Sequence, residues 1–571
     1  MTAPWNELAT AHRANQRACI NKDWLLSPEL LAQIAGTGQS DEGDLIARRA
    51  VDKSGLLTDK EIEITERYSV RGLLEEMATG MMSAFEVTQA FCKRAALAQQ
   101  LTSCLTEIFF DTGLQRAKEL DAYFSKHKKT KGPLHGLPIS LKESFQVEGQ
   151  FGTLGFVKGI AAGPASSNSD VVRLLLDAGA VLYCKTNIPQ TMMTADSENN
   201  IFGRTLNPHK TTLTAGGSSG GEGALVAFRG SILGVGTDIA GSIRIPSLCC
   251  GIYGFKPSIN RIPYGGQAPF PYPMLRVPGG IAPAAGPLAH SVEDLELFMR
   301  TVIGTENLNA SRYDPQSLPL VWRDLETVGE KKQLTIGLLA EDPEYPLQPP
   351  VRRAFQEAAL RLTHAGHRLV VLPHNATSSG AGLGGRLSFQ YYAILPPGPD
   401  VKPLDEILGE PLVASVAKGV HPFTGGFPVN PALDLPQRLH ELTEARDAYT
   451  AAWHGIWQAH ALDVVLAPGA ATTAVPHDSY GVPVYTCMWN LIDYPAGIIP
   501  FGKSSRELDP QPQKAVGPFE PHYDPDACEG APCAVQVVAP RLQDEECLRA
   551  MRIIDKVLND PSSFTPPIPP Q

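Results

Sequence analysis

Apolar residues recur with a helical period over several stretches of this sequence. The clearest stretch begins at Ser83, where Glu86 stands at the spacing of a capping box and Val87 and Phe91 fall on one face. The same period, with a capping residue in front, predicts further helices after Ser27, Ser69, Ser169 and Ser291 and over residues 543–558.

Strand-like apolar runs alternate with helices in the middle of the chain. The helix after Ser169 stops at Gly179, and the run 180–184 follows as a strand. This order returns with a strand over 334–339, a helix over 351–365 and a strand over 368–372. Because strands that alternate with helices build sheets covered on both faces, the pattern predicts an α/β fold with a largely parallel sheet.

Two stretches rich in Gly and Pro, 265–287 and 378–436, carry neither period and are predicted as long loops. Loops of this length in compact domains are usually lids or binding loops, and plain surface excursions are the alternative. The second stretch contains Phe389, Tyr391 and Tyr392, which either line an apolar pocket or pack in the core. We predict a lid or a pocket-lining region at 378–436.

Composition narrows the class of protein. The 571 residues are 43% hydrophobic and 19% charged, which suffices for a large core, and the net charge of -11 argues against a nucleic-acid surface. No run reaches the ~20 apolar residues that span a membrane, and the chain begins without the apolar run of a signal peptide. Ten cysteines without paired CxxC motifs are typical of reduced thiols, and no histidine pair has partners at metal-ligand spacing. We expect a cytoplasmic protein without a metal that acts on a small molecule.

Residues 216–223 form the most unusual segment, with four glycines and two serines in its first six positions. Its backbone N–H groups can form a nest that opens a helix and receives an anion or a polarised oxygen, with a flexible turn as the alternative. A nucleotide loop is disfavoured because Glu222 follows the last of these glycines where the Walker pattern needs lysine. A hydrolase elbow at Ser218 is disfavoured because residues 208–215 lack the apolar content of a buried strand.

Residues 234–246 carry a second candidate site. The small residues Ala240 and Gly241 let the backbone turn tightly, so that successive N–H groups can face the space beside the Ser242 hydroxyl. Such an arrangement suits the oxyanion that forms when a serine attacks a carbonyl group.

A serine nucleophile needs a base, and no histidine lies between His209 and His290 to suggest one nearby. A buried lysine can replace histidine, because loss of water favours the neutral amine. Lys142 is the candidate, since the alternation of Ile139 and Leu141 predicts a half-buried strand that ends there. A lysine that extends to the surface is the alternative interpretation.

Taken together, these segments resemble the amidase signature family of Ser-Ser-Lys hydrolases. Every restricted position of the family's glycine- and serine-rich signature is met from Gly216 to Ser247, and the likeness spans roughly residues 70–560. Within the family, the chain looks similar to the fungal acetamidase-like and fatty-acid-amide-hydrolase-like branches.

The resemblance implies a role for each signature residue. Ser242 is the implied nucleophile, Lys142 the base and Ser218 a bridging serine with a cis peptide. Neutral Lys142 takes the proton of Ser218 while Ser218 takes that of Ser242, and the resulting acyl-enzyme is hydrolysed by water. The implied oxyanion donors are the N–H groups of Ile239, Ala240, Gly241 and Ser242. The implied neighbours are Met192 near the acyl pocket, Ser219 as a hydrogen-bonding support, and Asp238 with Arg244 as residues that hold the loop.

The family fold is a mixed, mostly parallel twisted sheet of about eleven strands flanked by helices. We expect this catalytic domain at residues 71–571, after an N-terminal helical extension at 1–70. The implied reaction is the hydrolysis of a carboxylic amide to acid and amine or ammonia, without cofactor, and a homodimer is common among relatives. An amidotransferase-type subunit that needs a partner chain and a non-catalytic binding protein are the alternatives, and small, aryl and fatty amides all stay open as substrates.

Overall fold

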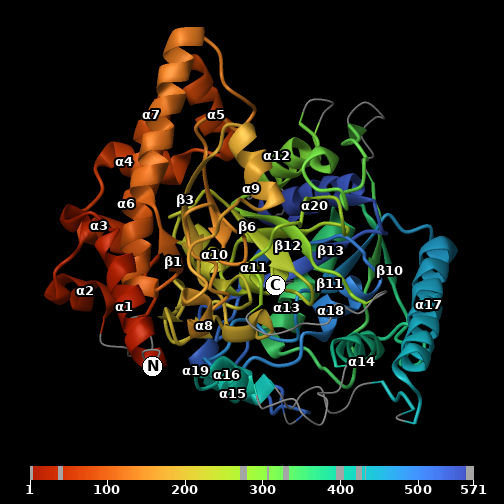
Figure 1. The fold of residues 1–571 in the computed structure, drawn as a ribbon. Coiled ribbons are helices and arrows are strands. Elements are labelled where there is room, and N and C mark those ends of the chain that lie inside the picture. Colours follow the sequence, from red (N-terminus) through yellow and green to blue (C-terminus); the bar gives the residue numbers. More distant parts are fainter. Residues whose placement is uncertain are drawn as a thin grey trace.

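A computed structural model describes residues 4–36, 43–270, 280–304, 308–325, 333–393, 404–419, 427–430, 432–517 and 519–560. Helices surround a large central sheet on both faces (Figure 1). Parts of the predicted loops 265–287 and 378–436 fall outside the described residues. No helix in the described parts is long and apolar enough to cross a membrane.

The central sheet has eleven strands, which confirms the predicted large mixed sheet with flanking helices. From one edge to the other its order is β1 (Leu105–Ile108), β3 (Val181–Thr186), β2 (Pro138–Lys142), β6 (Leu233–Asp238), β8 (Ala284–Ala289), β7 (Tyr253–Lys256), β12 (Ala496–Lys503), β13 (Pro532–Val538), β11 (Val464–Pro468), β9 (Thr335–Leu338) and β10 (Arg368–Val371). A separate hairpin pairs β4 (Glu198–Asn199) with β5 (Gly203–Arg204).

Parallel pairing is confined to two parts of this sheet. Strand β2 is parallel to β3 and β6, and β9 is parallel to β10 and β11. The strands between these groups pair antiparallel, from β6 through β8, β7, β12 and β13 to β11. The parallel share is therefore smaller than the helix-to-strand steps of the sequence predict, because those steps occur only at β2, β3 and β6 and at β9, β10 and β11.

Most helices of the first half lie toward the end of the sheet that carries β1 and β3 (Figure 1), whereas the last of them packs on β7, β12 and β13. They are α1 (Trp5–Ala18), η1 (Lys22–Trp24), α2 (Pro28–Ala35), α3 (Ala50–Ser54), α4 (Asp59–Arg67), α5 (Val70–Thr79), α6 (Ala84–Thr102), α7 (Phe110–His127), α8 (Val157–Ile160), α9 (Asp170–Asp177), η2 (Gln190–Met192), α10 (Gly220–Ala227) and α11 (Arg244–Cys249). The helix predicted after Ser83 begins with the expected capping box, in which Ser83 and Glu86 bond each other's backbone N–H groups.

The helices of the second half pack against the middle of the sheet as well as its other end. They are α12 (Val292–Ile303), η3 (Ala310–Arg312), α13 (Pro349–His364), α14 (Ala381–Tyr392), α15 (Leu404–Leu408), α16 (Ala414–Gly419), α17 (Leu435–His460), α18 (Val484–Leu491), α19 (Pro525–Cys528) and α20 (Asp544–Asn559). Helices α14, α15 and α16 lie inside the stretch 378–436, which the sequence predicted as loop. Glycine-rich α14 forms because it packs closely against α18, where a methyl group added at Gly385 would lie 2.6 Å from a Val484 carbon.

The first residues of the chain share the main hydrophobic core. Ile20, Trp24 and Ile34 belong to the same buried cluster as the sheet residues Ile139 and Val235. A buried hydrogen bond of 2.8 Å also joins His12 of α1 to Glu107 of β1. The helices at the start of the chain are therefore packed into the body of the protein.

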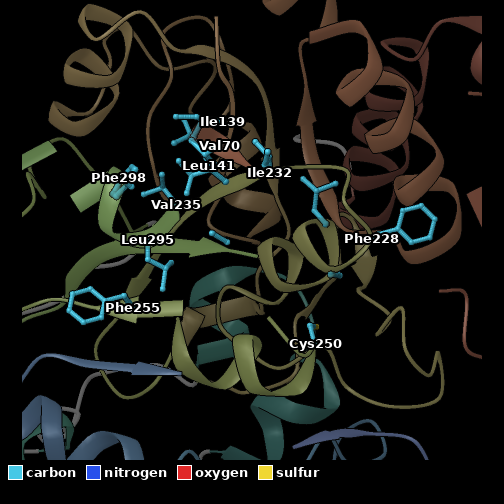
Figure 2. Close-up of a cluster of buried hydrophobic side chains, with 14 of the residues drawn as sticks. Val70, Ile139, Leu141, Phe228, Ile232, Val235, Cys250, Phe255, Leu295 and Phe298 are labelled. Atoms are coloured by element: carbon cyan, nitrogen blue, oxygen red, sulfur yellow. The ribbon is translucent and has the colours of Figure 1, made fainter. Parts of the chain in front are cut away.

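The core fixes the two strands from which the candidate site is built. Figure 2 shows Ile139 and Leu141 of β2 near Val235 of β6, with Leu295 and Phe298 of α12 beside them. Every residue of β2 is buried, which corrects the half-buried strand predicted from the sequence. Strand β2 lies between β3 and β6 in the sheet, so its last residue, Lys142, cannot reach the surface.

Candidate active site

Lys142 ends β2 in a fully buried position. Its Nζ donates hydrogen bonds to Ser218 Oγ at 2.7 Å and to Thr237 Oγ1 at 2.7 Å. No carboxylate of the described chain lies within 4 Å of this ammonium group, so both partners are neutral hydroxyls. The sequence prediction brought Lys142 and Ser218 together correctly but missed Thr237, which lies in β6 beside β2.

The surroundings of Lys142 favour the neutral amine. Burial lowers the pKa of Lys142 to about 7, although the charges of Asp238 and Glu222 act in the opposite direction. A large fraction of this side chain is therefore unprotonated near neutral pH. A neutral amine that contacts a serine hydroxyl is a suitable general base.

Ser218 lies in the glycine-rich segment before α10. The peptide bond between Gly217 and Ser218 is cis, as the family resemblance implied. The chain is so close to its neighbours here that a methyl group at Gly217 would lie 2.3 Å from the Thr194 carbonyl oxygen. The next residue, Ser219, donates its N–H to the Ser242 carbonyl at 3.1 Å and thereby ties the two predicted segments together.

Ser242 lies in the turn between β6 and α11, and its residue is 9% exposed. It is one of the residues that line a pocket. Among the described residues, no hydrogen bond joins the Ser242 and Ser218 hydroxyls. The Lys142–Ser218 hydrogen bond is therefore formed in this structure, and Ser242 lines the pocket without a hydrogen bond to Ser218 among the described residues.

A buried ion pair shapes the turn that carries Ser242. The side chains of Asp238 and Arg244 are both fully buried, and a guanidinium nitrogen of Arg244 lies 2.9 Å from Asp238 Oδ1. Asp238 also accepts the N–H groups of Gly241 at 2.9 Å and Ile243 at 3.1 Å, and the amide of Asn490 at 2.9 Å. Burial opposes ionisation of this carboxyl, but the charge and hydrogen bonds of Arg244 outweigh it and hold the pKa of Asp238 well below its usual range. The ionised carboxylate of Asp238 therefore stabilises the turn by accepting hydrogen bonds from its backbone N–H groups.

The turn leaves three backbone donors beside the Ser242 side chain. The N–H groups of Ile239, Ala240 and Ser242 have no hydrogen-bond partner in the described part of the chain. The structure differs from the prediction at Gly241, whose N–H is already donated to Asp238. The reason is that the Asp238 side chain folds back over its own turn, which the sequence pattern did not reveal.

The pocket beside Ser242 is mostly apolar. Met192, Ile239 and Ala240 are among its lining residues. The resemblance implies that Met192 lies near the acyl pocket. Phe389 of α14 also lines the pocket, so one part of the predicted pocket-lining region reaches the site. Tyr391, by contrast, is buried in a separate core cluster. Further lining residues are Met193, Ala195, Ile245, Val482, Pro483 and Phe519, with Asp196, Lys418 and Asp478 as charged members.

This arrangement suits acyl transfer. A lysine able to act as a base contacts one serine, a second serine faces an apolar pocket, and free N–H groups lie beside that second serine. In the described residues, no cluster of three or more His, Cys, Asp and Glu side chains is placed to hold a metal ion.

Comparison with known proteins gives consistent matches. The family model described as Amidase matches residues 86–548. An amidase of Gibberella moniliformis is 39% identical over 97% of this chain and 99% of its own length. An acetamidase of Emericella nidulans is 35% identical over 98% of this chain and 99% of its own length. Because these alignments cover 97% and 98% of this chain, the similarity includes most of the first 70 residues, which the resemblance over residues 70–560 had left out.

Solved structures that are similar to this chain also include amide hydrolases. A fatty acid amide hydrolase superimposes with a TM-score of 0.83 at 30% sequence identity, over 97% of this chain and 95% of that one. A bacterial aryl acylamidase of the amidase signature family has a TM-score of 0.68 at 21% identity and matches in fold.

Proposed function

The chain belongs to the amidase family and hydrolyses carboxylic amides to acid and amine, and we propose that it does so through an acyl-enzyme on Ser242 with Lys142 and Ser218 as the proton relay. The observation that carries this proposal is the hydrogen bond of 2.7 Å between Lys142 Nζ and Ser218 Oγ at a fully buried position. Within the described ranges, this lysine forms no ion pair with a carboxylate, and burial favours its neutral form.

The proposed reaction begins with substrate in the pocket and the Ser242 hydroxyl turned toward Ser218. Neutral Lys142 accepts the Ser218 proton, Ser218 accepts that of Ser242, and Ser242 Oγ attacks the amide carbonyl carbon. The relay then runs in reverse and protonates the leaving amine as the C–N bond breaks. Water repeats the sequence in the second half, when it attacks the acyl-enzyme and releases the acid.

The tetrahedral oxyanion is stabilised by the N–H groups of Ile239, Ala240 and Ser242. Each donor of this kind contributes about 3–4 kcal/mol to transition-state stabilisation. Asp238 and Arg244 hold the turn that presents these donors, and Ser219 ties that turn to the segment of Ser218.

We propose linear carboxylic amides as the substrates, with the acyl group against Met192. The acetamidase of Emericella nidulans and the fatty acid amide hydrolase act on a short and a long acyl group by their names. The apolar wall of the pocket is compatible with both lengths. Hydrolysis rates measured across amides of increasing acyl length would show which acyl length this enzyme prefers.

We also propose a cytoplasmic location and a homodimer. All ten cysteines are free, and nine of them are buried, which suits a reducing compartment. Fractionation of cells and light scattering of the purified protein test the two statements separately.

The experiment that tests the mechanism is labelling with a fluorophosphonate, alongside ammonia release from acetamide. Ser242→Ala should lose both labelling and turnover. Ser247→Ala is the matched control, because Ser247 lies in α11, is buried, and donates its hydroxyl to the Ile243 carbonyl outside the pocket. Labelling that persists in Ser242→Ala contradicts the proposal. Labelling without turnover favours a subunit that needs a partner, and intact protein that is not labelled favours a binding role.

A further inference from the structure

Two hydroxyl groups contact the turn 239–241 from outside. Thr486 of α18 donates its hydroxyl to the Ala240 carbonyl at 2.6 Å. Tyr392, the last residue of α14, donates its hydroxyl to the Ile239 carbonyl at 2.6 Å. Neither residue is part of the signature segments, and both carbonyls belong to the turn that holds the proposed oxyanion donors.

The two contacts hold consecutive peptide units. In a trans peptide, the carbonyl of one residue and the N–H of the next lie in one plane and point in opposite directions. The unit between Ala240 and Gly241 is held at both ends, because Thr486 bonds its carbonyl and Asp238 accepts its N–H. The unit between Ile239 and Ala240 is held only at its carbonyl, by Tyr392, within the described part of the chain.

We propose that Tyr392 is a positioning residue which, by fixing the Ile239 carbonyl, fixes the N–H group of Ala240 as an oxyanion donor. The inference rests on the proposed function, since it concerns the same Ser242 reaction. Rotation of this peptide unit would move the Ala240 N–H away from the pocket that Ala240 lines. An oxyanion donor contributes fully only when its direction is set before charge develops.

The helices that carry the two hydroxyls are held rigidly together. A methyl group at Gly384 of α14 would lie 2.7 Å from the Met488 Cβ of α18. Ser388 of α14 also donates its hydroxyl to the Cys487 carbonyl of α18 at 3.3 Å. The close approach of α14 and α18 therefore sets the distance between Tyr392 and Thr486, and with it the geometry of the turn.

The Tyr392 hydroxyl stays a donor over the working range of the enzyme. Burial raises the pKa of Tyr392 well above its ordinary value, and the nearby Cys487 and Asp238 act in the same direction. Ionisation of the phenol therefore does not remove this bond at alkaline pH, where Lys142 is neutral.

The test compares Tyr392→Phe with Tyr391→Phe. Tyr391 is the neighbouring tyrosine on the same helix, and its hydroxyl contacts Thr443 at 3.4 Å outside the pocket. Each variant removes one hydroxyl and keeps the ring, so the difference between them isolates the bond to Ile239. Both are assayed at a temperature where circular dichroism shows them folded.

Tyr392→Phe should lower kcat about 10-fold and leave KM within about twofold, because the lost orientation matters in the transition state. The inhibition constant of a trifluoromethyl ketone, whose adduct with serine carries an oxyanion, should weaken by a similar factor. Tyr391→Phe should change neither value.

The positioning role is overturned if Tyr392→Phe keeps the kcat and the inhibition constant of the parent protein. It is also overturned if Tyr391→Phe loses as much as Tyr392→Phe does. If Ser242→Ala keeps its activity, the proposed function itself fails, and this result is independent of Tyr392.

Discussion

Two fully buried lysines lie in neighbouring strands of this sheet, and they differ in what surrounds them. Lys142 of β2 and Lys185 of β3 are one residue apart in register, since Leu141 pairs with Lys185 and Lys142 with Thr186. Lys185 Nζ lies 3.1 Å from a carboxylate oxygen of Glu143, and both side chains are inaccessible to solvent. Among the described residues, the hydrogen-bond partners of Lys142 Nζ are the hydroxyls of Ser218 and Thr237.

The difference shows how one fold can hold a structural cation and, as we propose, a base that are the same residue type. A buried ammonium group is stable when a carboxylate compensates its charge, and the pair then serves structure. Without that carboxylate, desolvation favours the neutral form, and the pKa of Lys142 is lowered to about 7. The identity of the partner, more than burial itself, decides the function of each lysine.

The largest expected effect comes from Lys142→Met. Removal of the general base should lower kcat by about 10²–10⁴-fold, while the fold persists because the methionine chain fills the same buried space. Amide turnover and circular dichroism measure the two outcomes. No single His→Ala substitution should have a comparable effect, and a histidine of equal weight would contradict the relay.

The same variant should be more stable than the parent protein at low pH. Below about pH 7 the folded chain holds a charged Lys142 in a dry site, and the cost of that charge is present in full. As pH rises through about 7 the folded lysine loses its proton while the unfolded one keeps it until about 10.5, so the stability of the parent rises in this window. The difference in Tm between variant and parent should therefore shrink from pH 6 to pH 9, and a constant difference would contradict the lowered pKa.

Lys185→Met is expected to act on stability. It leaves Glu143 buried without its cation, and breaking one side of a buried pair costs about 3–5 kcal/mol. Denaturant unfolding measures the loss. Glu143 accepts the Thr153 N–H on one oxygen at 2.7 Å and the Thr106 hydroxyl on the other at 2.6 Å. In the double variant with Glu143→Gln, the amide oxygen can accept the Thr153 N–H and the amide NH2 can donate to Thr106 Oγ1, so part of the stability should be recovered. If Lys185→Met alone is as stable as the parent, the two lysines do not differ as described.

The sequence singled out the residues of the proposed relay but only part of their surroundings. Lys142, Ser218 and Ser242 lie in short segments whose residue types are dictated by the chemistry, and these could be found through the family resemblance. Thr237 could not be singled out, because threonine is common in strands and only the pairing of β2 with β6 brings it to Lys142. The donated Gly241 N–H was missed for a related reason, since the direction of the Asp238 side chain is a tertiary property.

The same division holds for the fold. The alternating helices and strands predicted an α/β fold, and the capping residues located the starts of α5, α6 and α12. Helix α14 was predicted as loop because glycine has low helix propensity, and its formation depends on packing against α18 that no local pattern contains. Tyr392 was therefore noticed as an aromatic residue, but its contact with Ile239 was not.

The smallest expected effect concerns the pH profile and Glu222. In the parent protein, kcat should rise with pH with a midpoint near 7, because only neutral Lys142 accepts the proton. Burial raises the pKa of Glu222 to about 8, so its carboxyl is mostly protonated at that midpoint and ionises just above it. The charge that then forms raises the pKa of Lys142, and the rise of kcat should extend over a broad range.

Glu222→Gln removes this second titration and keeps the shape of the side chain, including an oxygen that can accept the Ser140 hydroxyl, now at 2.6 Å. The midpoint should move to lower pH by less than about one pH unit, and the rise should become steeper, because no negative charge develops near Lys142. The pH dependence of kcat for acetamide in both proteins measures the shift. A shift to higher pH would mean that Glu222 acts on Lys142 through something other than its charge. Nearby carboxylates alone would then not explain why Lys142 and Lys185 differ.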